Sequence, residues 1–542
     1  MGDLEKSVFS LRANPRLGLD ADGGDDTNQG TVGQRAYEGL ARFIEEFPNV
    51  TVKVVAQPEL LGEFVLKFCA LPRVNFESSG GRIESDGRVT GERRKTATYK
   101  LLTDLSEGTL DGVLTCASNR GVVPIAHHVL DSIPGVTSIP ILAELPSMRG
   151  SYFGLDVGAT VDGTGEQLAQ FAKMGAAYVR AVKNKKYPTI ALLANSTDIG
   201  RTNQATREAH NILQGLRDVE YLGPLTALHF MDGRYGGKDI DLSVQDGFDG
   251  NLSIKGISAG ARHMKEGLEA KLKGKSLFGK LFSLSLANAT LDYLRTEYER
   301  IATHRLINHR SSDETIHAQI AQLPSRTGSY FCLDVGGTAD YTPQELSRVA
   351  RIGVEYAVKE WGKSPQDVTV GFLSNGEEFT KGNTLVRETM KLLAHENGIP
   401  MPRHVEPKHC LDGDVNVVIA PGSTGGIFKD SYIAGARLVC ATVAKGLENA
   451  KLGIFGPSFK RTLRAIAAPV SKSVYNGAAA LGLCVRNERV VSSDLPLAVD
   501  YSGVLFKGHG DSDADGYYYA LKRMLHYVNA DTTNRIAREL NQ

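Results

Sequence analysis

The chain has 542 residues, a length typical of about three to four domains, and its 62 basic and 62 acidic side chains cancel. No long block of like charge interrupts this balance, so the sequence offers no bulk attraction to nucleic acid. The six cysteines are scattered, without a CxxC pair or metal-type spacing with histidine, as is usual in a reducing compartment. We expect no metal site, no signal peptide in residues 1–15 and, without a run of roughly 20 apolar residues, no membrane-spanning helix.

Three passages along the chain share one order of elements: a short β-rich run, a glycine or polar turn, then a helical pattern. In the second and third, strands over 189–193 and 368–373 precede helices over 203–215 and 384–395. The first passage has its strand and turn within residues 111–121, and an apolar segment follows. This alternation predicts an open, mostly parallel α/β sheet, whose ligands usually lie beyond the carboxyl ends of the strands.

One passage occurs twice. Leu145–Asp162 reads LPSMRGSYFGLDVGATVD and Leu323–Asp340 reads LPSRTGSYFCLDVGGTAD, and most positions are identical. A repeat of this size indicates duplication of most of a domain, so one chain supplies both halves of a symmetric pair. By itself each passage reads as a buried strand and its turn, with Asp156 and Asp334 satisfying backbone amides.

The duplication suggests a division of the chain into five parts. These are an N-terminal α/β part (1–140), a first central copy with an amphipathic helical hairpin (141–300), a connector (301–315), a second central copy (316–474) and a C-terminal tail that completes the fold (475–542). Residues 21–33 and 74–95 are rich in glycine and charge and are expected to be loops.

Taken in order, these passages resemble the bacterial phosphate acyltransferases of phospholipid synthesis, the PlsX type. The matching segments are Gly18–Asp26, Cys116–Gly121, Leu130–Asp162, the DGFDGN motif Asp246–Asn251, Tyr475–Leu483 and His509–Gly510. The resemblance implies a Rossmann-like sheet of the isocitrate dehydrogenase and phosphotransacetylase type, with the duplicated copies forming an intrachain pseudo-dimer. It also implies a cleft near the junction of the two halves.

Each copy departs from the family pattern in a different place. The GEExxxKGN motif is intact in copy two as Gly376–Asn383, whereas copy one has Ser196–Asn203, which keeps only the asparagine and a basic residue. The DGFxGN motif is intact in copy one, whereas copy two reads Pro421–Gly426 and has lost the aspartate and the asparagine. The complementary losses suggest that the intact halves face each other, and that the mirror cleft with Arg201 opposite Pro421 is inactive.

The resemblance implies acyl transfer from the thioester of acyl carrier protein to inorganic phosphate, giving acyl phosphate without a covalent nucleophile, metal or organic cofactor. Lys381 would place a positive charge on the phosphate or oxyanion, and Asp246 would orient the lysine or accept a proton. The expected phosphate- and substrate-binding residues are Asp20, Gly23, Gly24, Asn119, Gly121, Asn251, Glu377, Glu378, Gly382, Asn383 and His509. Cys116 and Ser118 lie in a suitable loop, but no histidine partner is evident.

Other interpretations of these residues stay open. The pair Gly23–Gly24 is also typical of a plain turn, Glu377–Glu378 of a solvated helix start, and His509 of a structural loop. Asp22 and Asp26 stand where the family has methionine and histidine, and their charge would repel phosphate. A catalytically silent scaffold that binds acyl carrier protein or a membrane is therefore the alternative function. An NAD-linked dehydrogenase is disfavoured because no GxGxxG follows a strand.

The segment with Leu277, Phe278, Leu281 and Phe282 is apolar and flanked by lysines. Such a face is suited to peripheral membrane contact, and equally to a helix pair buried at the junction of the copies. Exposed basic residues nearby would suit an acidic acyl carrier protein. We expect a cytoplasmic protein, and the sequence leaves open membrane association and assembly into a further homo-oligomer.

Overall fold

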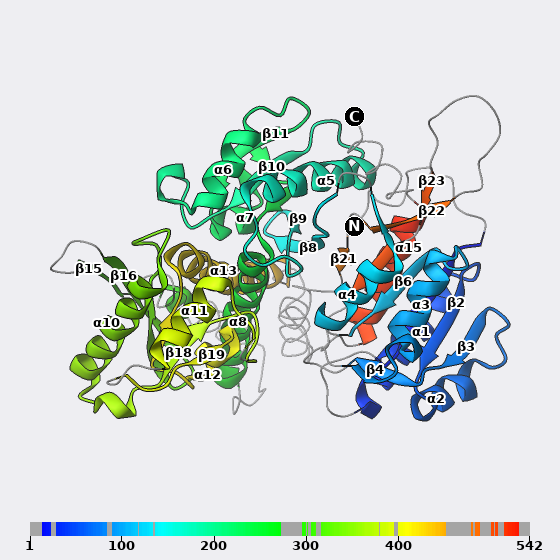
Figure 1. Cartoon of the computed structure of the whole chain (residues 1–542), viewed down its shortest axis with the longest axis horizontal. Helices are drawn as coiled ribbons and strands as arrows, with labels where there is room; N and C mark the ends of the chain where they lie inside the picture. The colour runs from blue at the N-terminus through cyan, green and yellow to red at the C-terminus, as the bar shows by residue number, and fades with distance from the viewer. Residues whose placement is uncertain are drawn as a thin grey trace. The chain divides into compact units, whose positions relative to one another are not determined.

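The computed structural model describes the chain in two compact units (Figure 1). Unit 1 comprises residues 1–144, 170–188 and 475–542, and unit 2 comprises 145–169 and 189–474. The residues described are 14–22, 29–83, 89–117, 119–133, 136–272, 295–299, 301, 305–310, 316–378, 380–394, 399–450, 478–480, 483–487, 500–502, 504–507 and 514–529. The proposed membrane segment with Leu277, Phe278, Leu281 and Phe282 lies outside them.

Unit 1 is built on a sheet in the order β21-β24-β6-β1-β2-β3, with the first half of β8 beside β21. β1, β2, β3, β6 and β24 are parallel, and β21 runs antiparallel to both of its neighbours. The strands are β1 (Arg16–Asp20), β2 (Thr51–Ala56), β3 (Val74–Ser78), β6 (Gly112–Thr115), β8 (Ile141–Ser147), β21 (Ala478–Ala480) and β24 (Val504–Lys507). Leu17, Leu19 and Val113 are fully buried, as expected of parallel strands covered on both faces.

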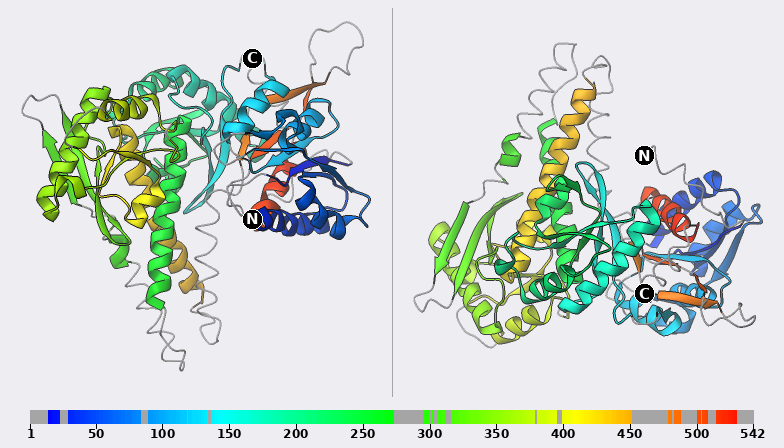
Figure 2. Two further views of the ribbon diagram at one scale, coloured as in Figure 1. Left: turned by 60° about the horizontal axis from the view of Figure 1, so that its bottom comes forward. Right: turned by 90° about the horizontal axis from the view of Figure 1, so that it is seen from above.

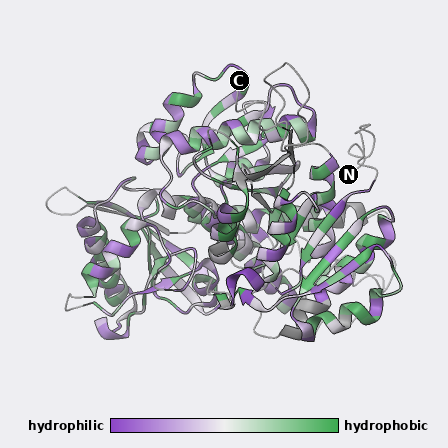
Figure 3. Cartoon of the chain, turned by 45° about the vertical axis from the view of Figure 1, so that its right-hand side comes forward, coloured by the Kyte–Doolittle hydropathy of each residue, from purple (hydrophilic) through white to green (hydrophobic). Residues whose placement is uncertain are grey.

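Helices cover this sheet, and two of them approach closely. A β-carbon at Gly39 would lie 2.7 Å from the carbonyl oxygen of Ala514, so only glycine lets α1 pack this tightly on α15. The helices are α1 (Gln29–Glu46), α2 (Pro58–Phe68), α3 (Ala97–Ser106), α4 (Asn119–Val129), α5 (Gly165–Lys183, shared with unit 2) and α15 (Ala514–Asn529). Figure 3 shows hydrophobic and hydrophilic residues mixed along the helices, as expected where one face covers a core.

The expected loop over 74–95 was wrong. It contains β3, β4 (Gly81–Ile83) and β5 (Val89–Gly91), followed by the short helix η1 (Arg93–Lys95). The prediction took the charged residues as a sign of a loop. Lys53 and Lys100 each form an ion pair of 2.6 Å with Glu77, so the charge of this residue is compensated although it lies in strand β3. Three short strands complete unit 1: β7 (Asp131–Ser132), β22 (Leu483–Asn487) and β23 (Asp500–Ser502).

Unit 2 repeats one strand order in both copies. Copy one has the parallel order β11-β10-β14-β9, and copy two has the matching parallel order β19-β18-β20-β17, extended by antiparallel β16 and β15. The strands are β9 (Gly150–Leu155), β10 (Thr189–Leu193), β11 (Glu220–Leu225), β14 (Leu242–Val244), β15 (Arg305–Arg310), β16 (His317–Ser325), β17 (Gly328–Leu333), β18 (Val370–Leu373), β19 (Arg403–Val405) and β20 (Val417–Ile419). The prediction of a mostly parallel α/β fold is confirmed.

The helices of unit 2 also correspond between the copies. They are α6 (Gln204–Leu213), α7 (Ala227–Asp232), α8 (Gly247–Leu272), α10 (Pro343–Trp361), α11 (Thr384–Leu393), α12 (Pro407–Asp412) and α13 (Gly422–Ala450). Short elements complete the unit: η2 (Ile199–Arg201), η3 (Pro365–Asp367) and the hairpin of β12 (Arg234–Tyr235) and β13 (Lys238–Asp239). The helices expected over 203–215 and 384–395 are confirmed as α6 and α11.

The long helices α8 and α13 join the two copies and lie side by side in both views of Figure 2. Their contact is reciprocal: a β-carbon at Gly260 would lie 1.9 Å from the carbonyl oxygen of Tyr432, and one at Gly435 would lie 2.0 Å from that of Ile257. Only glycine permits backbones this close. The helix that follows the DGFDGN motif is therefore in direct contact with its counterpart from copy two.

Candidate active site

The repeated passage ends in a loop that one buried carboxylate shapes in each copy. Asp156 accepts hydrogen bonds from the backbone amides of Gly158 (3.0 Å) and Thr160 (2.6 Å). Asp334 accepts the equivalent bonds from Gly336 (3.1 Å) and Thr338 (2.6 Å). The expected structural role of both aspartates is confirmed.

The start of α8 packs directly on this loop through the two glycines of DGFDGN. A β-carbon at Gly247 would lie 2.4 Å from the carbonyl oxygen of Thr160, and one at Gly250 would lie 1.9 Å from that of Asp156. Copy two has the same close contacts, at distances of 2.0 and 1.8 Å, at Gly422 and Gly425. These glycines serve packing, and both copies need them.

The first and last positions of the motif carry polar side chains only in copy one. Asp246 and Asn251 correspond to Pro421 and Gly426 in copy two. The side chain of Asp246 accepts a hydrogen bond from the backbone amide of Asp249 (2.8 Å). The buried Oδ1 atom of Asn251 has no hydrogen-bond partner in the part of the chain that is described. Such an oxygen is open to a hydrogen-bond donor from outside the protein, such as water or a ligand.

Two neighbouring carboxyls at the start of α8 have raised pKa values. Loss of hydration raises the pKa of Asp246 well above its usual value, and the nearby charge of Asp249 raises it further. Burial raises the pKa of Asp249 to about 6, although Thr424 of copy two donates a hydrogen bond of 2.8 Å to it. Asp246 therefore holds a proton more readily than an exposed aspartate does.

The intact GEEFTKGN loop of copy two depends on a glycine that copy one lacks. A β-carbon at Gly376 would lie 2.7 Å from Cγ of Lys381 and 2.7 Å from Oε2 of Glu378, so both side chains lie over this glycine. Gly382 has a φ of +88°, which favours glycine, and its amide donates to Asn375 (3.1 Å). The backbone conformation of the loop therefore sets the direction in which the side chain of Lys381 leaves the main chain.

Two predicted binding residues of this loop also have structural partners. Asn383 caps α11 by accepting a hydrogen bond from the amide of Val386 (2.9 Å). Glu377 is half exposed and forms ion pairs with Lys408 (2.8 Å) and His409 (3.2 Å). The carboxylate of Glu377 thus has partners within the protein, and its exposure agrees with the alternative interpretation of Glu377–Glu378 as solvated residues.

The two copies meet through Asp162, a residue that sequence reasoning did not select. Its carboxylate accepts hydrogen bonds from the amide (3.0 Å) and hydroxyl (2.6 Å) of Thr384, directly after the GEEFTKGN motif. Asp162 is also close enough to Asp246 to raise the pKa of that carboxyl. The structure thus brings the loop of Lys381 and the helix start of Asp246 to the same aspartate. Asp162 and Asp340 are the last residues of the two repeated passages, and this shared position was the signal in the sequence that could have pointed to Asp162.

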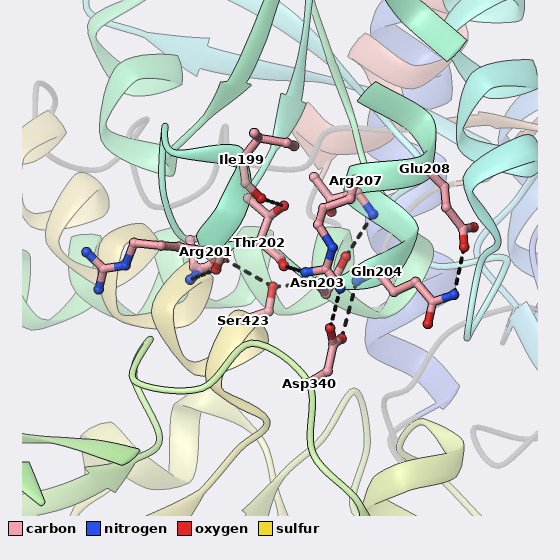
Figure 4. Close-up of polar contacts among 11 residues, drawn as sticks. Ile199, Arg201, Thr202, Asn203, Gln204, Arg207, Glu208, Asp340 and Ser423 are labelled. Atoms are coloured by element: carbon pink, nitrogen blue, oxygen red, sulfur yellow. Dashed lines mark hydrogen bonds and ion pairs between the residues drawn. The ribbon is translucent and has the colours of Figure 1, made fainter. Parts of the chain in front are cut away.

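The mirror cleft has the reciprocal contact but a different interior (Figure 4). Asp340 accepts from the amide of Gln204 (3.3 Å) and pairs with Arg207 (2.9 Å). The amide of Asn203 donates to the hydroxyl of Ser423 (3.4 Å), and the side chain of Arg201 extends away from that group.

The side chain of Asn195 occupies the place of the lost asparagine in the mirror cleft. A β-carbon at Gly426 would lie only 2.6 Å from Cβ of Asn195. The position of Asn195 therefore leaves no room for a side chain at residue 426, where copy one has Asn251. This supports the prediction of one working cleft without testing it.

Several of the candidate residues belong to unit 1. Asp20 is buried and accepts hydrogen bonds from Thr98 (2.5 Å) and Thr115 (2.8 Å). Gly121 faces Ile83, whose Cγ2 would lie 2.3 Å from an added β-carbon, so its glycine serves packing. Asn119 begins α4, and its side chain lies outside the described residues, as do Gly23, Gly24 and His509.

Asp22 is buried rather than facing a phosphate as a free charge. It accepts hydrogen bonds from the amide of Gln57 (2.5 Å) and the hydroxyl of Ser79. Burial, and then the charge of Asp20, raises its pKa to about 7. A substantial fraction of this carboxyl is therefore neutral at physiological pH, which weakens the repulsion expected from the sequence.

This raised pKa predicts a pH dependence of stability. An unfolded aspartate titrates near about 4, so between about 4 and 7 the folded state holds a proton that the unfolded state has lost. The stabilising contribution is full below this window and is lost as pH rises through it. Asp22→Asn should therefore show a shallower fall in the free energy of unfolding, measured by urea denaturation at pH 4.5, 6 and 7.5. Equal slopes for the two proteins would refute the assignment.

The described residues contain neither a metal-binding cluster nor a helix suited to cross a membrane. Within them, no group of three histidine, cysteine or acidic side chains is placed to hold a metal ion. Among the helices described, none combines the length and apolar character needed to cross a bilayer.

Comparisons with known proteins bear on the whole chain. The family model described as "Fatty acid synthesis protein" matches residues 15–307 and again residues 301–493, in agreement with the duplication. A phosphate acyltransferase of an Exiguobacterium species is 30% identical over 294 residues, covering 51% of this chain and 84% of that protein. One from Streptococcus equi subsp. zooepidemicus is 28% identical over 291 residues, covering 51% and 82%.

Solved structures are more distant. The EutD phosphotransacetylase from Staphylococcus aureus aligns with 45% of this chain and 81% of its own, at 16% identity and a TM-score of 0.33, too low to support an argument. The two matches of the family model together extend from residue 15 to residue 493, which is most of the chain. The resemblance seen in the motifs is thus confirmed, and the chain belongs to the fatty acid synthesis protein family, in which its curated relatives are named phosphate acyltransferase.

Proposed function

We propose that this protein transfers an acyl group from the thioester of acyl carrier protein to inorganic phosphate, at one composite site in unit 2. The relatives' name supports phosphate as the acceptor. The observation that carries the proposal is the bond between Asp162 and Thr384, which joins the intact motif of each copy around one carboxylate. On the mirror side, Asp340 accepts the equivalent bond from the amide of Gln204, which follows the altered motif of copy one.

In the proposed reaction an oxygen of hydrogen phosphate attacks the carbonyl carbon of the thioester. The C–O bond forms, the C–S bond breaks, and the proton of the phosphate ends on the sulfur of the leaving thiol. Lys381 stabilises the negative charge of the phosphate and of the oxyanion that develops. Asp246, with its raised pKa, orients Lys381 or carries the proton between phosphate and sulfur. Asn251 and Asn383 bind oxygens of the substrate through their amide groups.

The proposed test measures acyl phosphate by trapping with hydroxylamine, using long-chain acyl-ACP and inorganic phosphate. We expect product that depends on phosphate, and a higher kcat/KM with acyl-ACP than with the same acyl group on coenzyme A. Equal rates with both donors would contradict a role for acyl carrier protein. Binding of acyl-ACP without any product would overturn the enzyme proposal in favour of a silent scaffold.

A further inference from the structure

Lys255 of copy one contacts the catalytic loop of copy two. It lies on α8, nine positions after Asp246 along the sequence. Its ammonium group donates to the carbonyl oxygen of Asn375 (2.9 Å), the residue just before the GEEFTKGN motif, and forms an ion pair with Glu406. Both charged side chains are largely buried, at 26% and 15% exposure. An ion pair this sheltered is screened less by salt than a surface pair.

Glu406 extends this contact to a second residue at the same end of the loop, Glu377. Its second carboxylate oxygen lies 3.4 Å from Nζ of Lys408, and Lys408 pairs with Glu377 of the motif (2.8 Å). Burial raises the pKa of Glu406, but the charges of Lys255 and Lys408 outweigh it, so the pKa lies below its usual value. Glu406 is therefore ionised at neutral pH, and the chain of opposite charges holds the loop at Asn375 and at Glu377.

The mirror side has no such arrangement at the equivalent positions. Asp430 follows Pro421 by nine positions, as Lys255 follows Asp246, and it pairs with its neighbour Lys429 (3.2 Å). Glu406, the residue before α12, corresponds to Thr226, the residue before α7. The charge at the α8 position is thus reversed and its acidic partner is replaced by a hydroxyl. Of the two equivalent arrangements, the one with Lys255 and Glu406 is the one that contains the intact DGFDGN and GEEFTKGN motifs.

We propose that Lys255 is a positioning residue for the reaction, which holds the loop 375–383 of copy two on α8 of copy one and so places Lys381 for catalysis. It acts through the loop and touches no substrate. This inference rests on the proposed function, because a positioned Lys381 matters only where Lys381 takes part in the reaction. Displacement of a catalytic group by about 1 Å costs up to about a hundredfold in rate.

The test compares Lys255→Met, which removes the charge but keeps the length, with Lys255→Arg, which keeps both donor and charge. Lys255→Met should lower kcat/KM for acyl phosphate formation about tenfold to a hundredfold, and Lys255→Arg should recover most of it. The matched control is Asp430→Asn at the equivalent position of copy two, which should keep native activity. Full activity of Lys255→Met would overturn the proposal.

Hydrogen exchange supplies a second measurement that does not depend on turnover. The amides of Lys381 and Gly382, bonded to Glu378 and Asn375 within the loop, should exchange faster in Lys255→Met and unchanged in Asp430→Asn. Lost activity with unchanged exchange would mean that Lys255 acts on substrate directly, and would overturn a positioning role. If the native chain forms no acyl phosphate, the proposed function fails, and exchange alone decides whether Lys255 holds the loop.

Discussion

Lys381→Ala is expected to lower kcat/KM for acyl phosphate formation by about a hundredfold to a thousandfold, whereas Arg201→Ala should leave it within about twofold. The two residues occupy equivalent positions of the two copies. Lys381 lies over Gly376 in the intact loop, next to the contact with Asp162. The side chain of Arg201 extends away from Asn203 and Ser423 (Figure 4).

This pair of variants separates one working site from two. Steady-state rates at varied phosphate would also show where the loss falls, since removing a charge that acts in the transition state lowers kcat. Similar losses in both variants would indicate two active clefts and contradict the composite site. A near-native rate for Lys381→Ala would remove this lysine from the mechanism altogether.

The second large effect is expected from the helix contact that joins the copies. Gly435→Ala places a methyl group 2.0 Å from the carbonyl oxygen of Ile257, a distance that forces α8 and α13 apart. Overpacking of this kind costs about 2–3 kcal/mol of unfolding free energy. Because the proposed site draws residues from both copies, the variant should lose activity as well as stability. Urea denaturation and the acyl phosphate assay measure the two effects.

Gly62→Ala is the matched control for this variant. Gly62 lies in α2, where an added β-carbon would meet nothing within 4 Å. Alanine at an unobstructed helix position usually stabilises by about 0.5–1 kcal/mol. If Gly435→Ala proved as stable as this control, the close approach of the two helices would be wrong.

The repeated passage let the sequence predict most of the fold of unit 2. A strand and turn that occur twice indicated duplication of most of a domain, and both copies have the same strand order. The close packing of the motif glycines at the helix starts was not predicted. The strand–turn–helix patterns at 189–215 and 368–395 were visible because apolar runs and helical periodicity are local properties. The segment 74–95 was misjudged, because its charged residues are compensated by lysines far away in the sequence.

The contacts between the copies were beyond the reach of the sequence. Asp162 is separated from Thr384 by 222 positions, and Lys255 from Glu406 by 151. No local pattern distinguishes such residues from other charged residues on a surface. The motifs indicated which residues to consider, but only folding shows that Glu377 is held by Lys408 and that Asp22 is buried. The direct approach of Lys381 to Asp246 stays a prediction.

The joining of α8 and α13 within one chain has a consequence for how the protein responds to dilution. In a pair of separate subunits, the two halves of a shared cleft must find each other, and the fraction assembled falls with concentration. Here the covalent connection supplies the partner at a high effective concentration, fixed by the length of the intervening chain. Completion of the proposed site thus becomes part of folding, and each molecule carries both halves of it at any protein concentration.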